Sequence, residues 1–276
     1  MTSIVFPGQG SQIKGMAQDF YNNYDIAKNV FQIVENATNL NISEIIFDNS
    51  DNLLDITKYT QLAIFTSSMA IFEVFKNKYD FKNINYVLGH SLGEYSALVA
   101  SKSLTISECS NLLKIRGELM QNAFENNLSG MAAVLGLNCS EVEEIIKNNS
   151  LDIEVANDNA PGQVVISGII ENIKKSENIL KDMGAKKIIY LNVSAAFHSK
   201  LMKDAEKEME KYLLKAEIKD AVFPIISNYS AIPNTKKNLI FDNLSLQMSN
   251  RVRWRESIEY LAKKKESKII EIGPGK

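Results

Sequence analysis

The sequence predicts an α/β protein with one larger domain and a smaller domain inserted into it. Along the 276 residues, short apolar runs typical of strands alternate with longer segments whose apolar residues recur at helical spacing. Near the middle of the chain the expected elements follow the order β-α-β-β-α-β, which is the ferredoxin-like pattern. We therefore expect an inserted domain of residues 127–194, flanked by residues 1–126 and 195–276, which together form the larger α/β domain.

Before the insertion, strand and loop signals alternate with helical segments. The apolar residues 3–6 predict a strand, and Pro7, Gly8 and Gly10 end it in a loop. Residues 60–75 predict a helix that is apolar around most of its circumference and is therefore buried. The other elements expected in this part are helices at 16–34, 92–100 and 107–125 and a strand at 84–88.

In the insertion and the tail, capping residues, turn-forming residues and apolar spacing again predict the helices and strands. Ser140 is expected to cap the first helix of the insertion, and Gly184 to stop the second. Asn157–Gly162 is rich in turn-forming residues and predicts a loop between two strands. The expected strands lie at 131–135, 153–156, 164–167, 187–191, 223–227 and 268–272, and the expected helices at 140–147, 170–183 and 199–214.

Composition and charge exclude several classes of protein. With 31 Lys and Arg against 33 Asp and Glu, the formal net charge is -2, so the basic excess typical of nucleic-acid binding is missing. Cys109 and Cys139 are too few for a disulfide framework, and with only two histidines we expect no metal site. The sequence has neither an apolar run long enough to span a bilayer nor a signal peptide. We expect a cytoplasmic protein that binds neither nucleic acid nor membrane.

Gly89-His90-Ser91-Leu92-Gly93 is a G-x-S-x-G motif between an expected strand and an expected helix. In this context the motif is typical of a nucleophile elbow, in which a tight turn exposes the serine hydroxyl. The following helix presents its N-terminal N–H groups beside the serine, so the N–H of Leu92 is placed to bind an oxyanion. The alternative is a glycine-serine turn that only begins a helix.

A serine nucleophile needs a base, and the two histidines of the chain are His90 and His198. His90 is adjacent to Ser91, so its side chain is expected to point away from the hydroxyl, and a packing role is the simpler interpretation. His198 follows an expected strand, in a loop that can reach the motif; the alternative is a solvated loop residue. After Ser91, the sequence singles out no acid as the third member of a triad.

Six short motifs occur in an order that covers almost the whole chain. They are Phe6-Pro7-Gly8-Gln9-Gly10-Ser11-Gln12, Gly89-His90-Ser91-Leu92-Gly93-Glu94-Tyr95-Ser96-Ala97-Leu98, Arg116-Gly117, Asn159-Ala160-Pro161-Gly162-Gln163-Val164-Val165-Ile166-Ser167-Gly168, Ala196-Phe197-His198 and Glu271-Ile272-Gly273-Pro274-Gly275. In this combination the sequence resembles the malonyl-CoA:acyl-carrier-protein transacylases of type II fatty-acid synthesis. The resemblance implies an α/β-hydrolase-like parallel-sheet core with a ferredoxin-like insertion.

The resemblance also implies a role for each matching residue. Ser91 would be the acyl-accepting nucleophile, and His198 the base that takes its proton. A main-chain carbonyl near Gln247 would orient His198, which accounts for the missing acid. The main-chain N–H groups of Gln9 and Leu92 would form the oxyanion hole.

By the same resemblance, Arg116 would bind the free carboxylate of a malonyl group through two parallel hydrogen bonds. An acetyl group offers the guanidinium no partner, so such a site discriminates strongly between the two acyl groups. From the sequence alone, a surface arginine on the helix at 107–125 is the simpler interpretation. Gln61 matches a pocket-lining position, and Phe197 resembles the residue before the histidine in malonyl-selective members.

The implied function is transfer of a malonyl group from malonyl-CoA to Ser91 and then to the phosphopantetheine thiol of an acyl carrier protein. The resemblance implies no cofactor, and we expect a monomer. Because such carrier proteins are acidic, a local basic surface is expected. The candidate residues are Lys186, Lys187, Lys200 and Lys203, although a merely solvated lysine face has the same appearance in a sequence.

Other interpretations stay open at this point. A thioesterase or esterase would hydrolyse the acyl group, but a carboxylate-binding Arg116 has no purpose in an ordinary esterase pocket. A non-catalytic relative is disfavoured because Ser91 and His198 are both present. The Met1 start and the absence of flanking linkers favour a stand-alone enzyme over an acyltransferase domain of a polyketide synthase. The resemblance further implies a segment after Lys276 that packs on the larger domain, so a truncated chain is a further expectation.

Overall fold

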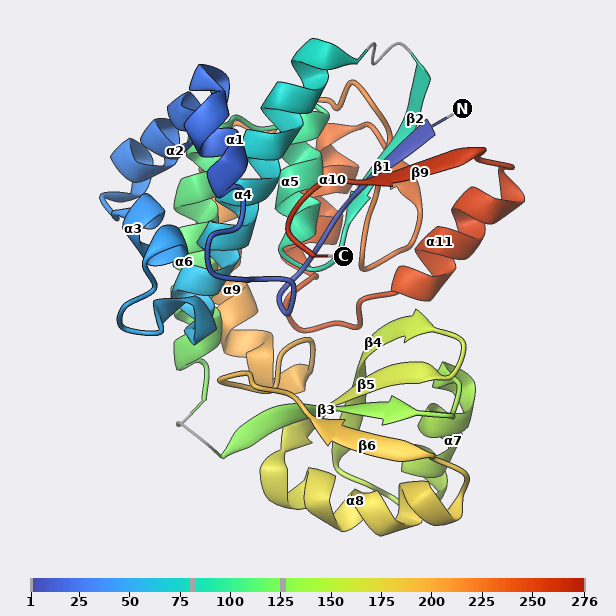
Figure 1. Ribbon diagram of the computed structural model, residues 1–276. Coiled ribbons are helices and arrows are strands. Elements are labelled where there is room, and N and C mark those ends of the chain that lie inside the picture. Colours follow the sequence, from blue (N-terminus) through green and yellow to red (C-terminus); the bar gives the residue numbers. More distant parts are fainter. Residues whose placement is uncertain (1, 80–82, 125–127, 276) are drawn as a thin grey trace.

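The computed structural model describes residues 2–79, 83–124 and 128–275, and it contains two sheets that lie in different parts of the molecule (Figure 1). The larger part holds a five-stranded sheet and most of the helices. The smaller part holds a four-stranded sheet with two helices on one side. The chain enters the smaller part at residue 128 and returns to the larger part after residue 190, so the α/β class predicted from the sequence is confirmed.

The five-stranded sheet has the order β8-β7-β2-β1-β9. Its strands are β1 (Thr2–Phe6), β2 (Ile84–Gly89), β7 (Ile225–Ile226), β8 (Pro233–Asn234) and β9 (Lys268–Glu271). β7, β2, β1 and β9 run parallel, and β8 is antiparallel to β7. The register pairs Phe6 with Gly89, so the loop after β1 and the loop after β2 leave the sheet side by side.

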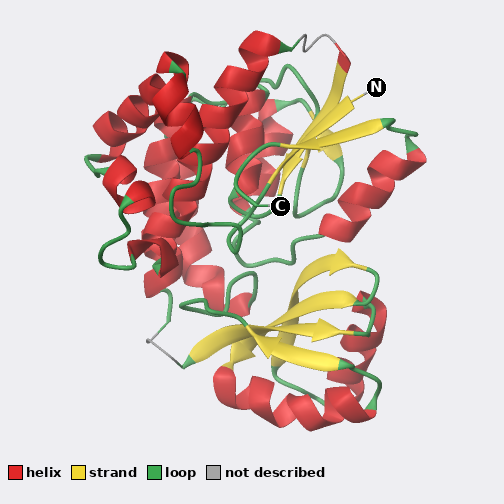
Figure 2. Ribbon diagram, in the orientation of Figure 1, coloured by secondary structure: helices red, strands yellow, loops and turns green. Residues whose placement is uncertain are grey.

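Helices cover both faces of this sheet (Figure 2). Alternate strand residues point to opposite faces. Ile4, Val87 and Ile225 therefore face one layer of helices, whereas Val5 and Leu88 pack with Leu261 of α11 on the other face. The helices of this part are α1 (Gln18–Asn23), α2 (Asp25–Thr38), α3 (Ile42–Phe47), α4 (Thr57–Lys78), α5 (Gly93–Ala100), α6 (Ile106–Asn122), α9 (Lys203–Leu213), α10 (Lys237–Ser245) and α11 (Trp254–Lys263), with 3-10 turns at Leu53–Asp55 and Lys200–Met202.

The four-stranded sheet has the order β4-β5-β3-β6, and every neighbouring pair is antiparallel. Val134 and Ile166 face α7 and α8 and form a core of their own, whereas Met131 and Val165 face the larger part. The sheet thus closes one side of the space above β1 and β2. In chain order its elements are β3 (Ser129–Leu135), α7 (Cys139–Asn148), β4 (Ile153–Ala160), β5 (Gln163–Ile169), α8 (Ile170–Asp182) and β6 (Lys187–Tyr190).

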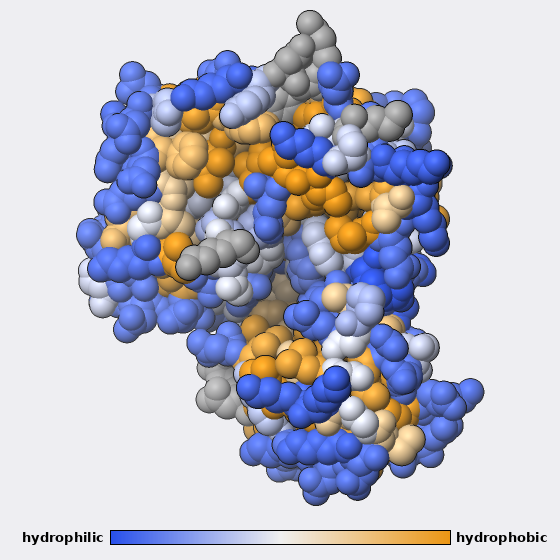
Figure 3. Space-filling model, turned by 45° about the vertical axis from the view of Figure 1, so that its right-hand side comes forward, coloured by the Kyte–Doolittle hydropathy of each residue, from blue (hydrophilic) through white to orange (hydrophobic). Residues whose placement is uncertain are grey.

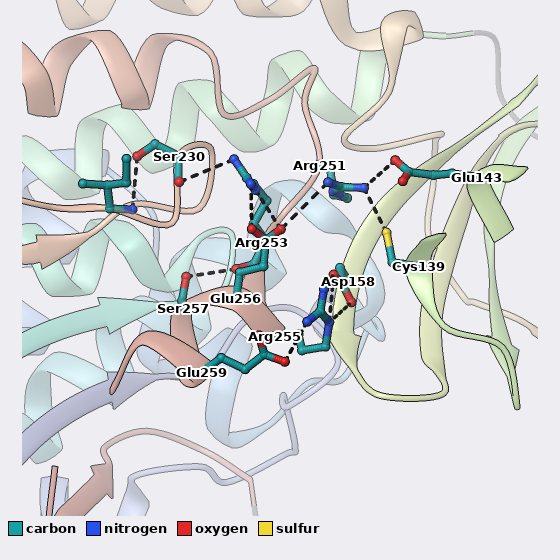
Figure 4. A network of polar contacts seen from close by, with 11 residues as sticks. Cys139, Glu143, Asp158, Ser230, Arg251, Arg253, Arg255, Glu256, Ser257 and Glu259 are labelled. Carbon is teal, nitrogen blue, oxygen red and sulfur yellow. Dashed lines mark hydrogen bonds and ion pairs between the residues drawn. The ribbon is translucent and has the colours of Figure 1, made fainter. Parts of the chain in front are cut away.

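A short segment before α11 joins the two parts (Figure 4). The carbonyl of Val252 accepts the main-chain N–H of Asp158 at 3.0 Å, which extends the smaller sheet by one bridge. Arg255 donates to both carboxylate oxygens of Asp158, with Nη2 2.8 Å from Oδ2. Arg251 forms an ion pair with Glu143 at 2.6 Å. These contacts fix β4 and α7 against the larger part.

One expected helix of the larger part differs from the structure, and one expected helix end cannot be compared with it. The helix predicted at 16–34 is wrong as one element, because Tyr24 is extended (φ -135°, ψ 117°) and separates α1 from α2. Asn22 and Asn23 are weak helix formers before the break, and Asp25 favours a new N-terminus after it. The expected end of the helix at 107–125 and the expected domain boundary at 126/127 lie outside the described residues.

Further differences concern the insertion and the tail. The predicted loop Asn157–Gly162 is wrong for its first four residues, because pairing with β5 extends β4 to Ala160. The predicted cap Ser140 is also wrong. Asn138 caps α7, and Glu141 accepts the Asn138 main-chain N–H at 2.7 Å. The tail helix expected at 199–214 begins as a 3-10 turn, and the short elements α3, α10, α11 and β8 were not anticipated.

Candidate active site

Ser91 lies on a sharp turn between β2 and α5, as the G-x-S-x-G motif predicts. Its φ is +52°, in the left-handed region that strains residues with a side chain. The turn is this tight because its glycines have no Cβ. A Cβ on Gly89 would lie 2.0 Å from the Gly93 carbonyl, and a Cβ on Gly93 would lie 2.5 Å from the Phe6 carbonyl oxygen. The two glycines let α5 begin directly against β1.

His198 is the histidine that reaches the serine. Its Nε2 lies 2.8 Å from Ser91 Oγ, and its Nδ1 lies 3.0 Å from the main-chain oxygen of Gln247. A carbonyl oxygen only accepts, so Nδ1 carries the proton and Nε2 is free to accept the serine proton. Burial, reinforced by the positive charge of Arg116, lowers the pKa of His198 to about 3. The imidazole is therefore neutral at physiological pH.

Arg116 is buried in the same place, although the sequence alone favoured a surface position. It extends from α6 and is only 1% exposed. Its Nη1 donates to Gln61 Oε1 at 2.5 Å, and its Nη2 donates to Gln247 Oε1 at 2.8 Å and to Ser91 Oγ at 3.0 Å. Burial lowers the pKa of Arg116, whereas the nearby Tyr95 and Glu94 raise it. The guanidinium is held by neutral amides beside the serine.

Ser91, His198 and Arg116 share one cavity of about 350 Å³ between the two parts of the molecule. Figure 3 shows the recess between the parts from outside. The larger part supplies most of the polar groups, and the smaller part supplies Met131 and Asn157. The other lining residues are Gln9, Gly10, Gln12, Asp55, Gln61, His90, Leu92, Met120, Leu191, Asn192, Val193 and Phe197.

The two residues proposed for an oxyanion hole face this cavity. Gln9 lies in the loop after β1 and anchors its side chain by donating to Thr57 Oγ1 at 3.2 Å. Leu92 follows Ser91 at the start of α5. Among residues 2–79, 83–124 and 128–275, no acceptor bonds to the main-chain N–H of either residue. Both N–H groups are free to donate to a ligand.

His90 and Phe197, two further residues considered from the sequence, also line the cavity. The ring of His90 bonds through Nε2 to Asn159 Oδ1 at 2.9 Å and meets Trp254 edge to face at 5.5 Å. Burial lowers the pKa of His90, so the ring is neutral and packs, as the simpler interpretation holds. Phe197 is buried at the cavity wall next to His198.

Two residues that hold the turn were not singled out from the sequence. Asn228 Oδ1 accepts the main-chain N–H of Ser91 at 2.6 Å, and Asn228 Nδ2 donates to the Gly89 carbonyl at 2.7 Å. Glu94 accepts from Asn228 and from the side chain of Gln247. Glu94 belongs to a quoted motif, which was an available signal, whereas nothing in the local sequence marks Asn228.

The four candidate lysines of a docking surface have different surroundings. Lys200 pairs with Asp152 at 2.6 Å, and Lys203 pairs with Glu206 at 2.5 Å. Lys186 and Lys187 are exposed near the edge strand β6.

The described residues provide neither a metal-binding cluster nor a membrane-spanning helix. In residues 2–79, 83–124 and 128–275, no three His, Cys, Asp or Glu side chains gather in a way that could hold a metal ion. Over the same ranges, no helix has both the length and the apolar character needed to cross a membrane.

Comparison with known proteins agrees with this geometry. An acyl transferase domain matches residues 4–275. The malonyl CoA-acyl carrier protein transacylase of Staphylococcus aureus (strain MRSA252) is 41% identical over 278 residues, which cover 100% of this chain and 89% of the relative.

Solved structures have the same fold. The acyl-carrier-protein-S-malonyltransferase of Bartonella henselae superposes with a TM-score of 0.95 at 37% identity, over 99% of this chain and 88% of that one. A malonyl-transacylase in complex with a type II PKS acyl-carrier protein has a TM-score of 0.95 at 31% identity, over 99% of this chain and 89% of that one. The resemblance inferred from the motifs is thereby confirmed, and the chain belongs to the malonyl CoA-acyl carrier protein transacylase family of acyl transferases.

Proposed function

We propose that this protein transfers a malonyl group from malonyl-CoA to the phosphopantetheine thiol of an acyl carrier protein in fatty-acid synthesis. The main support for this proposal is the position of Arg116 beside Ser91 and His198. A buried guanidinium, that of Arg116, lies 3.0 Å from a serine hydroxyl that also bonds to a neutral histidine. A nucleophile, its base and a carboxylate-binding cation thus open into one cavity, which suits a thioester that carries a free carboxylate.

In the first half-reaction Ser91 Oγ attacks the thioester carbonyl of malonyl-CoA, and His198 Nε2 takes the hydroxyl proton. The carbonyl oxygen becomes an oxyanion, to which the free N–H groups of Gln9 and Leu92 donate. When the tetrahedral intermediate collapses, the C–S bond breaks and the coenzyme A sulfur receives the proton from His198. The malonyl group is then an ester of Ser91, and His198 is neutral again.

The second half-reaction runs through the same groups. His198 takes the proton of the phosphopantetheine thiol, and the sulfur attacks the malonyl ester. Collapse of the second intermediate breaks the bond to Ser91 Oγ, which regains its proton from His198. The carbonyl of Gln247 holds the imidazole in the required tautomer in both halves. The related malonyl-transacylase solved with an acyl-carrier protein supports this choice of acceptor.

Selection of the acyl group is assigned to Arg116. In the ligand-free site its Nη2 donates to Ser91 Oγ, and a bound carboxylate would replace that contact with two parallel bonds from the end of the guanidinium. Gln61 and Gln247 hold the guanidinium from its other sides. Phe197 forms part of the wall that limits the size of the acyl group.

We also propose a domain organisation and a setting for the enzyme. An α/β-hydrolase-like catalytic domain of residues 1–126 and 195–276 would carry a ferredoxin-like inserted domain of residues 127–194. The strand order β4-β5-β3-β6 and the βαββαβ chain order support the insertion. A monomer in the cytoplasm, without metal or other cofactor, is our expectation for the working enzyme.

The proposed reaction is tested by measuring the mass of the intact protein after mixing with malonyl-CoA, with acetyl-CoA in a parallel tube. We expect a malonyl adduct in the first tube, little or no adduct in the second, and no adduct with the Ser91→Ala variant. A holo acyl carrier protein added to the adduct should remove it and gain the same mass.

Each contrary result has a definite meaning. Release of coenzyme A without an adduct, and without transfer to the carrier protein, would indicate a hydrolase. Equal labelling by malonyl-CoA and acetyl-CoA would overturn the role of Arg116. A Ser110→Ala variant serves as the matched control, because Ser110 is a buried serine whose hydroxyl donates within α6, to the Ile106 carbonyl. It should be labelled like the wild type.

A further inference from the structure

Glu94 is a buried carboxylate one helical turn after the nucleophile, and no step of the proposed reaction uses it. The residue is 3% exposed. Its oxygens accept hydrogen bonds from three neutral groups: Ser227 Oγ at 3.1 Å, the Asn228 main-chain N–H at 3.2 Å and Gln247 Nε2 at 2.7 Å. Burying a carboxylate costs free energy unless hydrogen bonds compensate for the lost hydration. The groups that donate to Glu94 are therefore the place to look for its role.

The contact with Gln247 determines which way that side-chain amide points. Gln247 Nε2 donates to Glu94 and to the main-chain oxygen of Ser91, at 2.7 Å and 3.0 Å, while its Oε1 accepts from Arg116. A carboxylate can only accept and a guanidinium can only donate. An amide placed between them therefore has a single favourable orientation. Without the carboxylate, Gln247 would lose one of the two acceptors that hold its NH₂ group away from Arg116.

The contact with Asn228 determines the position of the turn itself. The main-chain N–H of Asn228 donates to Glu94, and its side chain bridges the two sides of the elbow, from the Ser91 N–H to the Gly89 carbonyl. The bond to Glu94 fixes the main chain of Asn228, and the bonds to Ser91 and Gly89 then fix its side-chain amide. Glu94 therefore supports the serine turn through Asn228 and the guanidinium of Arg116 through Gln247.

We propose that Glu94 is a positioning residue for malonyl transfer, whose carboxylate orients the Gln247 amide and the Asn228 main chain and thereby aims Arg116 at the acyl group on Ser91. The proposal rests on the function proposed above and assigns a residue outside the reacting atoms. It predicts that loss of the acceptor at position 94 harms malonyl transfer more than acetyl transfer, because only malonyl depends on Arg116.

The charges of the site agree with this assignment. Burial raises the pKa of Glu94 above its ordinary value, and the bonds from Gln247, Asn228 and Ser227 and the charge of Arg116 offset only part of that rise. In return, the negative charge of Glu94 raises the pKa of Arg116 against the effect of burial. The three donors and Arg116 thus oppose the effect of burial and stabilise the ionised form, which is the form that accepts from all three partners.

Three variants separate the acceptor from the charge and from mere packing. Glu94→Leu removes the acceptor and the charge. Glu94→Gln removes only the charge, since its amide oxygen can accept from Asn228 and Gln247 while its NH₂ group donates to the Ser227 hydroxyl. Glu266→Leu is the matched control, because Glu266 also accepts from neutral partners, Ser3 and Asn85, on a part of the sheet that does not line the cavity.

The readout is the ratio of kcat/KM for malonyl-CoA to that for acetyl-CoA, measured on folded protein. Damage to the fold lowers both values together and leaves the ratio unchanged, whereas a misdirected Arg116 lowers the ratio. We expect the ratio to fall at least about tenfold in Glu94→Leu, and to stay within about threefold of the wild type in Glu94→Gln and in the control.

An unchanged ratio in Glu94→Leu overturns the proposal, as does a Glu94→Gln variant whose ratio falls as far as that of Glu94→Leu. If Glu94→Leu shows no cooperative thermal unfolding, Glu94→Asp replaces it. Its shorter side chain withdraws the acceptor from Gln247 and should also lower the ratio, and an unchanged ratio in Glu94→Asp overturns the proposal equally. Absence of any malonyl adduct on the wild-type protein would overturn the proposed function itself, which distinguishes that failure from the failure of the Glu94 assignment.

Discussion

The Nε2 of His198 lies 2.8 Å from the Oγ of Ser91, although 107 residues separate them in the chain. Both residues have a left-handed main chain, with φ of +56° and +52°. Such strain persists only where the surrounding structure fixes it. Here Met248 and Gln247 hold His198, through its main chain and its ring, and Asn228 holds the main chain of Ser91. The serine–histidine contact is therefore built into the backbone before substrate binds.

The first prediction concerns the pH dependence of acylation. His198 must be neutral to accept the serine proton, and its pKa is lowered to about 3, mainly by burial. Activity that needs the neutral form is present above that pKa and lost below it. The single-turnover rate with malonyl-CoA should therefore stay nearly constant from about pH 7 to about pH 5, where an ordinary histidine of pKa about 6.5 is mostly protonated.

A variant provides the control for that profile. Arg116→Met removes the positive charge that contributes to the low pKa of His198, so any acid limb with acetyl-CoA should move to higher pH in this variant. A wild-type rate that declines with a midpoint near pH 6.5 would contradict the prediction.

The second prediction concerns Arg116 as the malonyl-binding group. Arg116→Ala should lower kcat/KM for malonyl-CoA by about 10²-fold, the scale of a lost charged hydrogen-bond pair, and leave acetyl transfer unchanged or faster. Arg116→Lys should recover only part of the loss, because an ammonium is a point charge and cannot serve Gln61, Gln247 and a carboxylate together. Steady-state kinetics with both acyl-CoA substrates measure the effect, and a parallel loss for both substrates would count against it.

The third prediction concerns the tight turn at Ser91. Gly89→Ala would place a Cβ 2.0 Å from the carbonyl of Gly93, and backbone atoms on both sides cannot move apart without displacing α5. We expect this variant to lose cooperative thermal unfolding or to unfold far below the wild type. Gly130→Ala is the control: its Cβ meets only the Ile170 side chain at 3.4 Å, so the cost should be within about 1 kcal/mol. Equal melting temperatures for Gly89→Ala and the wild type would show that the turn tolerates a side chain.

The fourth prediction concerns the joint between the two parts. The Asp158 side chain is 1% exposed and pairs with Arg255, so Asp158→Asn should lower the free energy of unfolding by about 1.5–3 kcal/mol. Asp220→Asn is the control, since Asp220 and its partner Lys236 are both exposed and such pairs contribute about 0–1 kcal/mol. Urea unfolding of both variants measures the difference, and equal effects would mean that the joint does not depend on this ion pair.

Much of the fold could be predicted because the spacing of apolar residues within each segment indicates its secondary structure. The strand at β1, the buried helix α4 and the βαββαβ order each follow from apolar spacing that does not depend on distant contacts. The predictions are wrong where contacts with residues distant in the sequence override the local pattern. Asn157–Ala160 has the composition of a turn, yet pairing with β5 and the bridge to Val252 make it part of a strand.

The candidate site shows the same division. By itself, the sequence determined that Ser91 lies on a strand–turn–helix elbow, because the glycines that permit this turn are its neighbours in the chain. Only the tertiary structure decided that Arg116 is buried beside Ser91 and that the backbone of Gln247 orients His198. The tertiary structure also brings Asn228 into contact with the turn at Ser91, and Glu94 into contact with Asn228. These contacts join residues as far as 156 positions apart, and their distances depend on how the parallel sheet and its helices pack, which no local pattern specifies.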